Sequence, residues 1–141
     1  MTLALSVVRK TILEEHALIK GKLSELEKLV TQEKAQSIKN VFEEFSSLFL
    51  KHLVTEENLL VPALADIDAW GSIRVEKLGE EHAEQSRILK DLQTLVQEKS
   101  FTEYKKDLTL FIKSIYEDIE REEKDFLSAD LLKDDLVTSG H

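Results

Sequence analysis

Histidine and carboxylate side chains recur along this chain at helical positions where the surrounding pattern places apolar residues. His52 and Glu56, for example, are four residues apart, so their side chains lie on the same face of a helix. Imidazole nitrogens and carboxylate oxygens are ligands for iron, manganese and zinc. Cysteine is absent, so any bound metal would be held by nitrogen and oxygen alone. The candidate ligands are His16, His52, Glu56, His82, Asp118 and Glu122.

The histidine-bearing segment occurs twice in the sequence. EEHALIKGKLSELEKLV, residues 14–30, aligns without a gap with EEHAEQSRILKDLQTLV, residues 80–96, at an offset of 66 residues. The same offset relates His52 to Asp118 and Glu56 to Glu122. The sequence therefore predicts an internal repeat in which each copy is a helical hairpin. Two related sets of ligands would suit two metal ions that a glutamate bridges.

Four segments of the chain must position these side chains. Apolar residues recur at spacings of three and four over about residues 5–30, 38–63, 75–96 and 104–126, as in amphipathic helices. Such a seam is typical of a left-handed bundle, and short connections make successive helices antiparallel. We therefore predict an all-α protein, an antiparallel up-down-up-down four-helix bundle, in a single domain over residues 1–141. The core is expected over about residues 5–130, and the tail, 128–141, is expected to add a short helix (LLKDDLV).

The predicted helix ends carry local signals. Thr31 and Ser72 are candidate N-caps of the second and third helices, and Pro62 is expected to bend or end the second. Ser100 and Glu103 fit a capping box, in which each side chain satisfies the other residue's free amide. Turns at these places put the candidate ligands at similar depths in the four helices.

Similar depths mean that the candidate ligands should meet in one layer of the core. Buried ionisable groups without partners are destabilising, and two divalent cations would offset their charge. Taken singly, His16 could be a hydrogen-bonded core residue, and EDIEREEKD, residues 117–125, could be a solvated face. The agreement of helix, depth and repeat favours a metal site. Four adjacent glutamates should point about 100° away from the ligands, to the surface or behind them: Glu15, Glu57, Glu81 and Glu123.

Charge and composition exclude several classes of partner. The chain has 28 acidic and 19 basic residues among 141, a net charge of −9, which disfavours nucleic acids and anionic membranes. No apolar run reaches the roughly 18 residues of a membrane span. The N-terminal LALSVV, residues 3–8, is too short for a secretory signal and is followed, not preceded, by basic residues. By elimination, we expect a cytoplasmic protein.

The spacing and the residue sequence of these segments resemble those of the hemerythrin-like (HHE cation-binding) domain family over about residues 5–130. The resemblance rests on EEHA, KHLVTEENLLVPAL and EREEKDFL, which contain the candidate ligands. It implies a bundle that holds two non-haem iron ions with an oxo or hydroxo bridge. Histidines would be terminal ligands, and Glu56 and Glu122 would bridge the ions, with zinc or manganese as alternative metals. Family members bind or sense oxygen or iron, or respond to nitric oxide and peroxide.

Two positions depart from the family pattern. Asp118 stands where the fourth helix should carry a histidine, and Ser86 stands where oxygen-carrying hemerythrins have a second histidine. The resulting set of three histidines and three carboxylates is harder and favours ferric ion. We expect a protein that binds or senses oxygen, redox state or iron, with an unknown protein partner if it is a sensor. A di-iron enzyme acting on peroxide, nitric oxide or ferrous iron is one alternative, and a metal-poor bundle acting as an interaction module is another.

Overall fold

The computed structural model describes residues 3–133, which form helices and short turns with no strand among them. No helix in this range is long and apolar enough to cross a membrane. The elements are α1 (Leu5–Thr31), α2 (Ala35–Thr55), the π-helical turn η1 (Glu56–Leu60), α3 (Val61–Ala65), α4 (Gly71–Glu98) and α5 (Phe101–Asp125).

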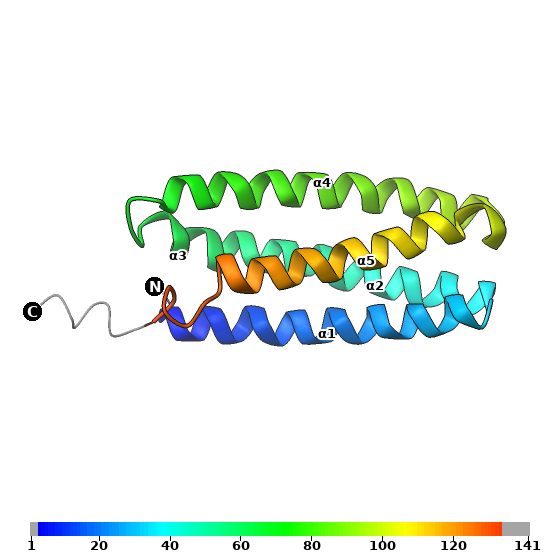
Figure 1. Cartoon of the computed structure of the whole chain (residues 1–141), viewed down its shortest axis with the longest axis horizontal. Coiled ribbons are helices and arrows are strands. Elements are labelled where there is room, and N and C mark those ends of the chain that lie inside the picture. The colour runs from blue at the N-terminus through cyan, green and yellow to red at the C-terminus, as the bar shows by residue number, and fades with distance from the viewer. Residues whose placement is uncertain (1–2, 134–141) are drawn as a thin grey trace, which may run out of the picture.

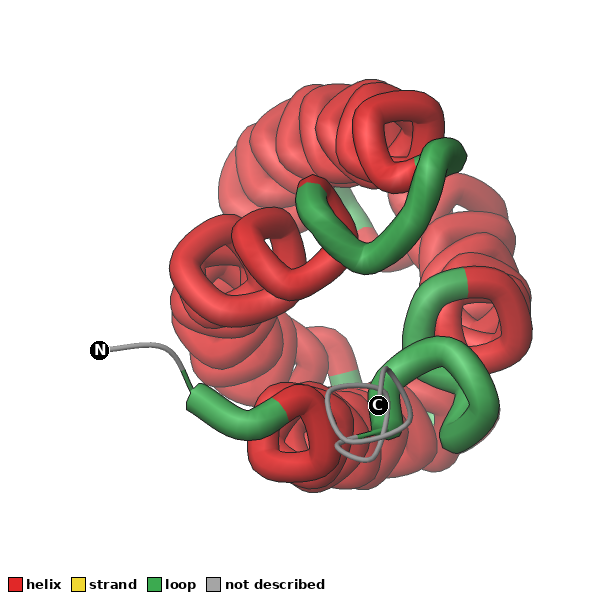
Figure 2. The backbone as a smooth tube through the Cα atoms, turned by 90° about the vertical axis from the view of Figure 1, so that its left-hand side faces the viewer, coloured by secondary structure: helices red, strands yellow, loops and turns green. Residues whose placement is uncertain are grey.

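The helices are arranged as four rods. The backbone stays helical from α2 through η1 into α3, so these three elements form one continuous rod. Figure 1 shows the rods lying along one long axis, and Figure 2 shows them end-on around a common centre. The predicted all-α four-helix bundle is therefore confirmed.

The predicted starts of two helices have different outcomes. Ser100 and Glu103 form the expected capping box at the start of α5, so this prediction is confirmed. The prediction that Ser72 caps α4 is wrong, because the helix already begins at Gly71. The turn before it is organised instead by the Asp68 carboxylate, which accepts a backbone amide at 2.9 Å.

The end of α1 also differs from the prediction. Thr31 does not cap α2, because its hydroxyl donates to the Glu27 carbonyl (3.0 Å) and it is the last residue of α1. The helix closes in a Schellman motif, with Glu33 in the left-handed region (φ 55°) and the Lys34 amide bonded to the Leu29 carbonyl (3.1 Å). Glutamate gives no sequence signal for this conformation, in which glycine is the usual residue.

Pro62 marks a change of helix type and not the end of the second rod. The helix widens ahead of it into η1, where the Val61 amide bonds the Glu56 carbonyl five residues back. Pro62 then lies in the first turn of α3, where a missing amide hydrogen is tolerated. The sequence did not predict this π turn, which begins at the candidate ligand Glu56.

A polar layer divides the core into two apolar clusters. One includes Phe45, whose ring stacks on that of Phe49 with 5.5 Å between the centroids. The other includes Ile12, Leu64 and Leu78, towards the opposite end of the bundle. Most of the candidate ligands lie in the layer between them. Its buried residues are His16, His52, Glu56, His82, Gln85 and Glu122.

The segment after α5 covers one end of the core. Phe126, Leu127 and Leu132 are buried, and Arg9 on α1 donates from Nε to the Leu127 carbonyl (2.7 Å). A single hydrogen-bonded turn closes from Ser128 to Leu132, and residues 128–133 contain no helix. The rest of the predicted C-terminal helix lies outside the described residues.

Gly71→Ala is expected to lower the free energy of unfolding by about 2 kcal/mol. An added Cβ would press on the backbone carbonyl oxygens of Leu64 and Ala65, which cannot move without opening the turn before α4. Gly79→Ala is the matched control, because no described atom outside its own helix lies within 4 Å of a Cβ there. Alanine at that position should raise stability by about 0.5–1 kcal/mol. Urea unfolding measures both changes. If Gly71→Ala were as stable as the wild type, the turn before α4 would have room for a Cβ atom.

Candidate metal centre

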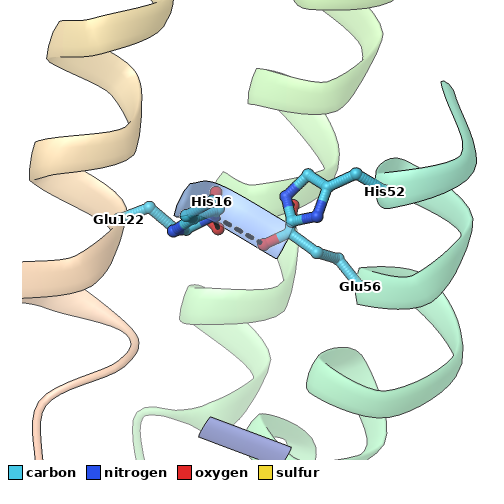
Figure 3. Close-up of side chains that lie close together, drawn as sticks. All are labelled: His16, His52, Glu56 and Glu122. Atoms are coloured by element: carbon cyan, nitrogen blue, oxygen red, sulfur yellow. Dashed lines mark hydrogen bonds and ion pairs between the residues drawn. The ribbon is translucent and has the colours of Figure 1, made fainter. Parts of the chain in front are cut away.

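Four side chains from different elements converge in the polar layer, as Figure 3 shows. One nitrogen or oxygen atom from each lies within 4.8 Å of the atoms from the others. All four residues are at most 3% exposed, so water does not screen them. The members of this cluster are His16 of α1, His52 of α2, Glu56 of η1 and Glu122 of α5.

Glu56 lies at the centre of the cluster. Its Oε1 atom is 3.1 Å from His52 Nε2 and 3.0 Å from His82 Nε2, so it contacts histidines of α2 and α4. Its Oε2 atom is buried without a hydrogen-bond partner among residues 3–133 and lies 3.9 Å from His16 Nε2. The same His16 nitrogen is 3.0 Å from Glu122 Oε1. One carboxylate thus faces each of the three candidate histidine ligands.

Two further carboxylates hold histidine rings from behind. Glu15 Oε1 lies 2.7 Å from His52 Nδ1, and Glu15 Oε2 accepts the Thr55 hydroxyl (3.0 Å). Glu123 Oε2 lies 2.9 Å from His16 Nδ1. A carboxylate on Nδ1 fixes the ring so that Nε2 points into the cluster, as is common behind metal-bound histidines. The sequence placed both glutamates beside the candidate ligands, and the geometry agrees.

The predicted ligands His82 and Asp118 are placed differently. His82 is 6% exposed and joins the cluster through Glu56. The Asp118 side chain is 20% exposed and turns aside, where it accepts hydrogen bonds from Arg121 (2.6 Å) and Gln85 (3.0 Å). The structure therefore brings five of the six candidates together and leaves Asp118 outside. Ligation of metal by these residues stays a prediction.

Burial and mutual contact give the two central glutamates opposite charge states. Burial alone raises the pKa of Glu56, but hydrogen bonds from Glu122 and two histidines outweigh burial and lower that pKa. Burial raises the pKa of Glu122 well above its usual value, and the ionised Glu56 raises it further. The contact between the two carboxyl groups therefore favours the protonated form of Glu122 and the ionised form of Glu56.

Two neighbouring histidines also differ in their affinity for protons. The rings of His16 and His52 lie 4.8 Å apart between centroids. Burial lowers the pKa of His16, and repulsion from His52 lowers it further. Burial also acts to lower the pKa of His52, but Glu56 and Glu15 outweigh it and raise that pKa. Because a metal-bound histidine must give up its proton, His16 is the more readily available ligand.

The residues of the cluster fit a divalent metal ion. Imidazole nitrogens and carboxylate oxygens are the usual ligands when sulfur is absent. The Oε2 atom of Glu56 is the most informative, because no nitrogen or hydroxyl donor among residues 3–133 reaches it. Only a proton shared with the Glu122 carboxyl, or a cation, can offset the cost of burying it. The buried histidine and glutamate cluster therefore fits a metal site.

Comparison with known proteins points the same way. The model of the hemerythrin HHE cation-binding domain matches residues 7–129, a range that includes the whole polar layer. The chain belongs to the hemerythrin HHE family. No curated protein and no solved structure matches the chain significantly. The family predicted from the sequence is thus confirmed.

Three residues outside the predicted ligand set donate hydrogen bonds to carboxylates beside the cluster. Thr55 donates to Glu15, whereas Gln85 and Arg121 donate to Asp118. A signal existed for one pair, because Thr55 and Arg121 are 66 residues apart, the offset of the repeat. Comparing every position of the two repeats, and not only the ligand types, identifies them.

Proposed function

We propose that this hemerythrin-family protein holds two non-haem iron ions in the polar layer, bridged by an oxo or hydroxo group. We further propose that it binds or senses oxygen, redox state or iron. The Glu56 carboxylate carries the proposal, because it is buried among histidines of three helices and no nitrogen or hydroxyl donor among residues 3–133 reaches one of its oxygens. A carboxylate in this position is suited to bridging two cations in a helical bundle. Family membership supports cation binding.

Five residues of the layer would hold the ions. His16, His52 and His82, whose Nε2 atoms face carboxylates of the cluster, would supply nitrogen ligands. Glu56 and Glu122 would supply carboxylate ligands. Because the pKa of Glu122 is raised, an ion that bound there would compete with a proton for this carboxylate. Bound iron would supply one-electron redox chemistry and an open position for a small ligand.

A surface cavity is lined in part by His82, which also contacts Glu56 of the polar layer. Its volume is about 480 Å³, and its lining is mainly small or apolar, including Leu53, Val54, Gly79 and Ala83. Such a lining admits uncharged molecules more readily than ions. The cavity therefore supports oxygen or nitric oxide as the ligand.

The position of Asp118 supports a second candidate function, an enzyme acting on peroxide, nitric oxide or ferrous iron at the same site. Because this carboxylate lies outside the cluster, one ion would keep a coordination position for substrate or water. The two functions differ in the step after binding. An enzyme releases a product, whereas a sensor needs an unidentified protein partner.

Anaerobic titration of ferrous iron into the metal-free protein is expected to saturate at two ions per chain. Exposure to air should then produce near-ultraviolet and visible charge-transfer bands that reduction removes and re-oxidation restores. A featureless spectrum after full loading would contradict the oxygen proposal. Saturation below one ion would contradict the metal proposal, and zinc or manganese in the purified protein would identify a different resident metal.

Peroxide consumption separates binding from catalysis. Turnover well above that of the same amount of free iron would favour the enzyme. Rates no greater than those of free iron, together with the charge-transfer bands, would favour a binding or sensing protein.

A further inference from the structure

The two repeats place different residues behind corresponding ligand positions. In the first repeat, His52 of α2 is held by Glu15 of α1, and Glu15 accepts a hydrogen bond from Thr55 (3.0 Å). Because Thr55 carries no charge, it does not compete for the histidine. His52 is therefore free to direct Nε2 at Glu56, at a distance of 3.1 Å.

In the second repeat, Asp118, Glu81 and Arg121 occupy the corresponding positions. Asp118 Oδ1 accepts a hydrogen bond from Arg121 Nη2 (2.6 Å), and Asp118 Oδ2 accepts one from Gln85 Nε2 (3.0 Å). Arg121 Nη2 also lies 3.6 Å from Glu81 Oε2. Both carboxylate oxygens of Asp118 are therefore already partnered.

These contacts hold Asp118 at the side of the bundle. Asp118 and Arg121 of α5, with Glu81 and Gln85 of α4, line a surface cavity of about 510 Å³. The charges account for the arrangement, because aspartate in place of histidine adds a negative charge and arginine in place of threonine adds a positive one. Arginine stays charged at every accessible pH, so Arg121 is a permanent counter-ion of Asp118. A metal ion must compete with it for that carboxylate.

We propose that Arg121 sets the metal stoichiometry of the centre by holding Asp118 in an ion pair outside the cluster. The inference rests on the proposed function. The first ion enters the cluster, whose ligand atoms already converge. The second ion would bind beside His82 and would gain Asp118 as a ligand only after Asp118 leaves Arg121 and Gln85, so it binds more weakly. Arg121 is thus a positioning residue that does not itself touch the ions.

An exposed ion pair adds little to the stability of the fold, but an ion that takes the Asp118 carboxylate must break its hydrogen bonds to both Arg121 and Gln85. The ion pair between Arg121 and Asp118 keeps the Asp118 carboxylate away from the second ion, which has few other ligands. The second ion therefore loses affinity, whereas the first does not, since none of the cluster residues is held by Arg121. The expected result is a centre that loads in two separate steps.

Arg121→Thr, which restores the residue type of the first repeat, tests the proposal. Manganese(II) is titrated into metal-free protein, and electron paramagnetic resonance distinguishes free ions, single bound ions and spin-coupled pairs. In the wild type, we expect the second ion to bind about tenfold or more weakly than the first, because a charged hydrogen bond must break. In Arg121→Thr, the second ion should bind about tenfold more tightly, and coupled pairs should form at lower manganese concentration.

Two further variants make the result specific. Arg87→Thr is the matched control, because Arg87 is an exposed arginine paired with Glu84 and Asp91 of its own helix, and its loss changes the net charge equally. It should bind manganese as the wild type does. Arg121→Lys keeps the charge and should retain most of the difference between the two ions. Circular dichroism checks folding, and Arg121→Gln replaces Arg121→Thr if the threonine variant does not fold.

The outcomes separate this inference from the proposed function. Equal affinities for both ions in the wild type would overturn the inference, as would an unchanged second affinity in Arg121→Thr, while the metal site would stand. Equal gains in Arg121→Thr and Arg87→Thr would also overturn it, because they would reflect net charge alone. Failure of the wild type to bind either manganese or iron would instead contradict the proposed function.

Discussion

Glu56→Gln is expected to weaken metal binding by about a hundredfold or more. The amide keeps the shape of the side chain but loses the charge and one acceptor oxygen. Glu56 contacts His52 and His82 and faces His16, so its loss should affect both ion positions together. Calorimetric titration with manganese or ferrous iron, and metal analysis after dialysis, measure the change.

Glu57→Gln is the matched control, because Glu57 is the next residue of η1 and is exposed. It removes the same charge from the same turn and should leave metal binding as in the wild type. Equal metal binding by Glu56→Gln and the wild type would exclude Glu56 as a ligand. If Glu56→Gln were also the more stable protein without metal, a metal-poor interaction module would explain the bundle better.

The fold could be predicted from the sequence because its signals are local. Apolar residues at spacings of three and four need only that helices pack side by side to become buried. Phe45 and Phe111, which the repeat relates, are both buried, and so are Leu26 and Leu92. A histidine at such a position, as at His16, interrupts the pattern visibly. The polar layer was therefore predictable from the same periodicity that gave the helices.

What could not be predicted depends on backbone geometry or on contacts between helices. The π turn at Glu56 and the left-handed Glu33 have residue types that carry no signal for those conformations. The outward turn of Asp118 depends on Arg121 of its own helix and Gln85 of α4. Neither partner is a metal-ligand type, so a search for ligands alone does not find them.

The metal-free protein is expected to lose stability as the pH rises from about 6.5 to 8. Burial raises the pKa of Glu122 well above 4.5, and burial together with Asp118 raises that of Glu81 to about 7. The folded protein therefore keeps these protons at a pH where the unfolded chain has released them. The resulting stabilisation is complete below pH 4.5 and is lost as the pH rises through the folded pKa of each group. The raised pKa of His52 acts in the same direction above pH 6.5.

Two groups oppose this trend, but in other pH ranges. Glu56 has a lowered pKa, so its contribution is complete above pH 4.5 and is lost as the pH falls below that value. The pKa of His16 lies below 6.5, so the folded protein resists a proton that the unfolded chain accepts, and stability falls only below that pH. Between pH 6.5 and 8, the groups with raised pKa values therefore decide the slope.

Bound metal should reverse the sign of that slope. Protons compete with the ion for the same glutamates and histidines, so metal stabilises the protein more as the pH rises. Urea unfolding at pH 6.5 and 8, with chelator or with saturating manganese, measures both slopes. Glu122→Gln is neutral in both the folded and the unfolded protein, so it should flatten the dependence of the unfolding free energy on pH in the metal-free protein. An unchanged pH dependence would mean that the pKa of Glu122 is not raised. Because Glu122 and His52 both bind protons in this range and are proposed ligands, the reversal tests the site and its electrostatics together.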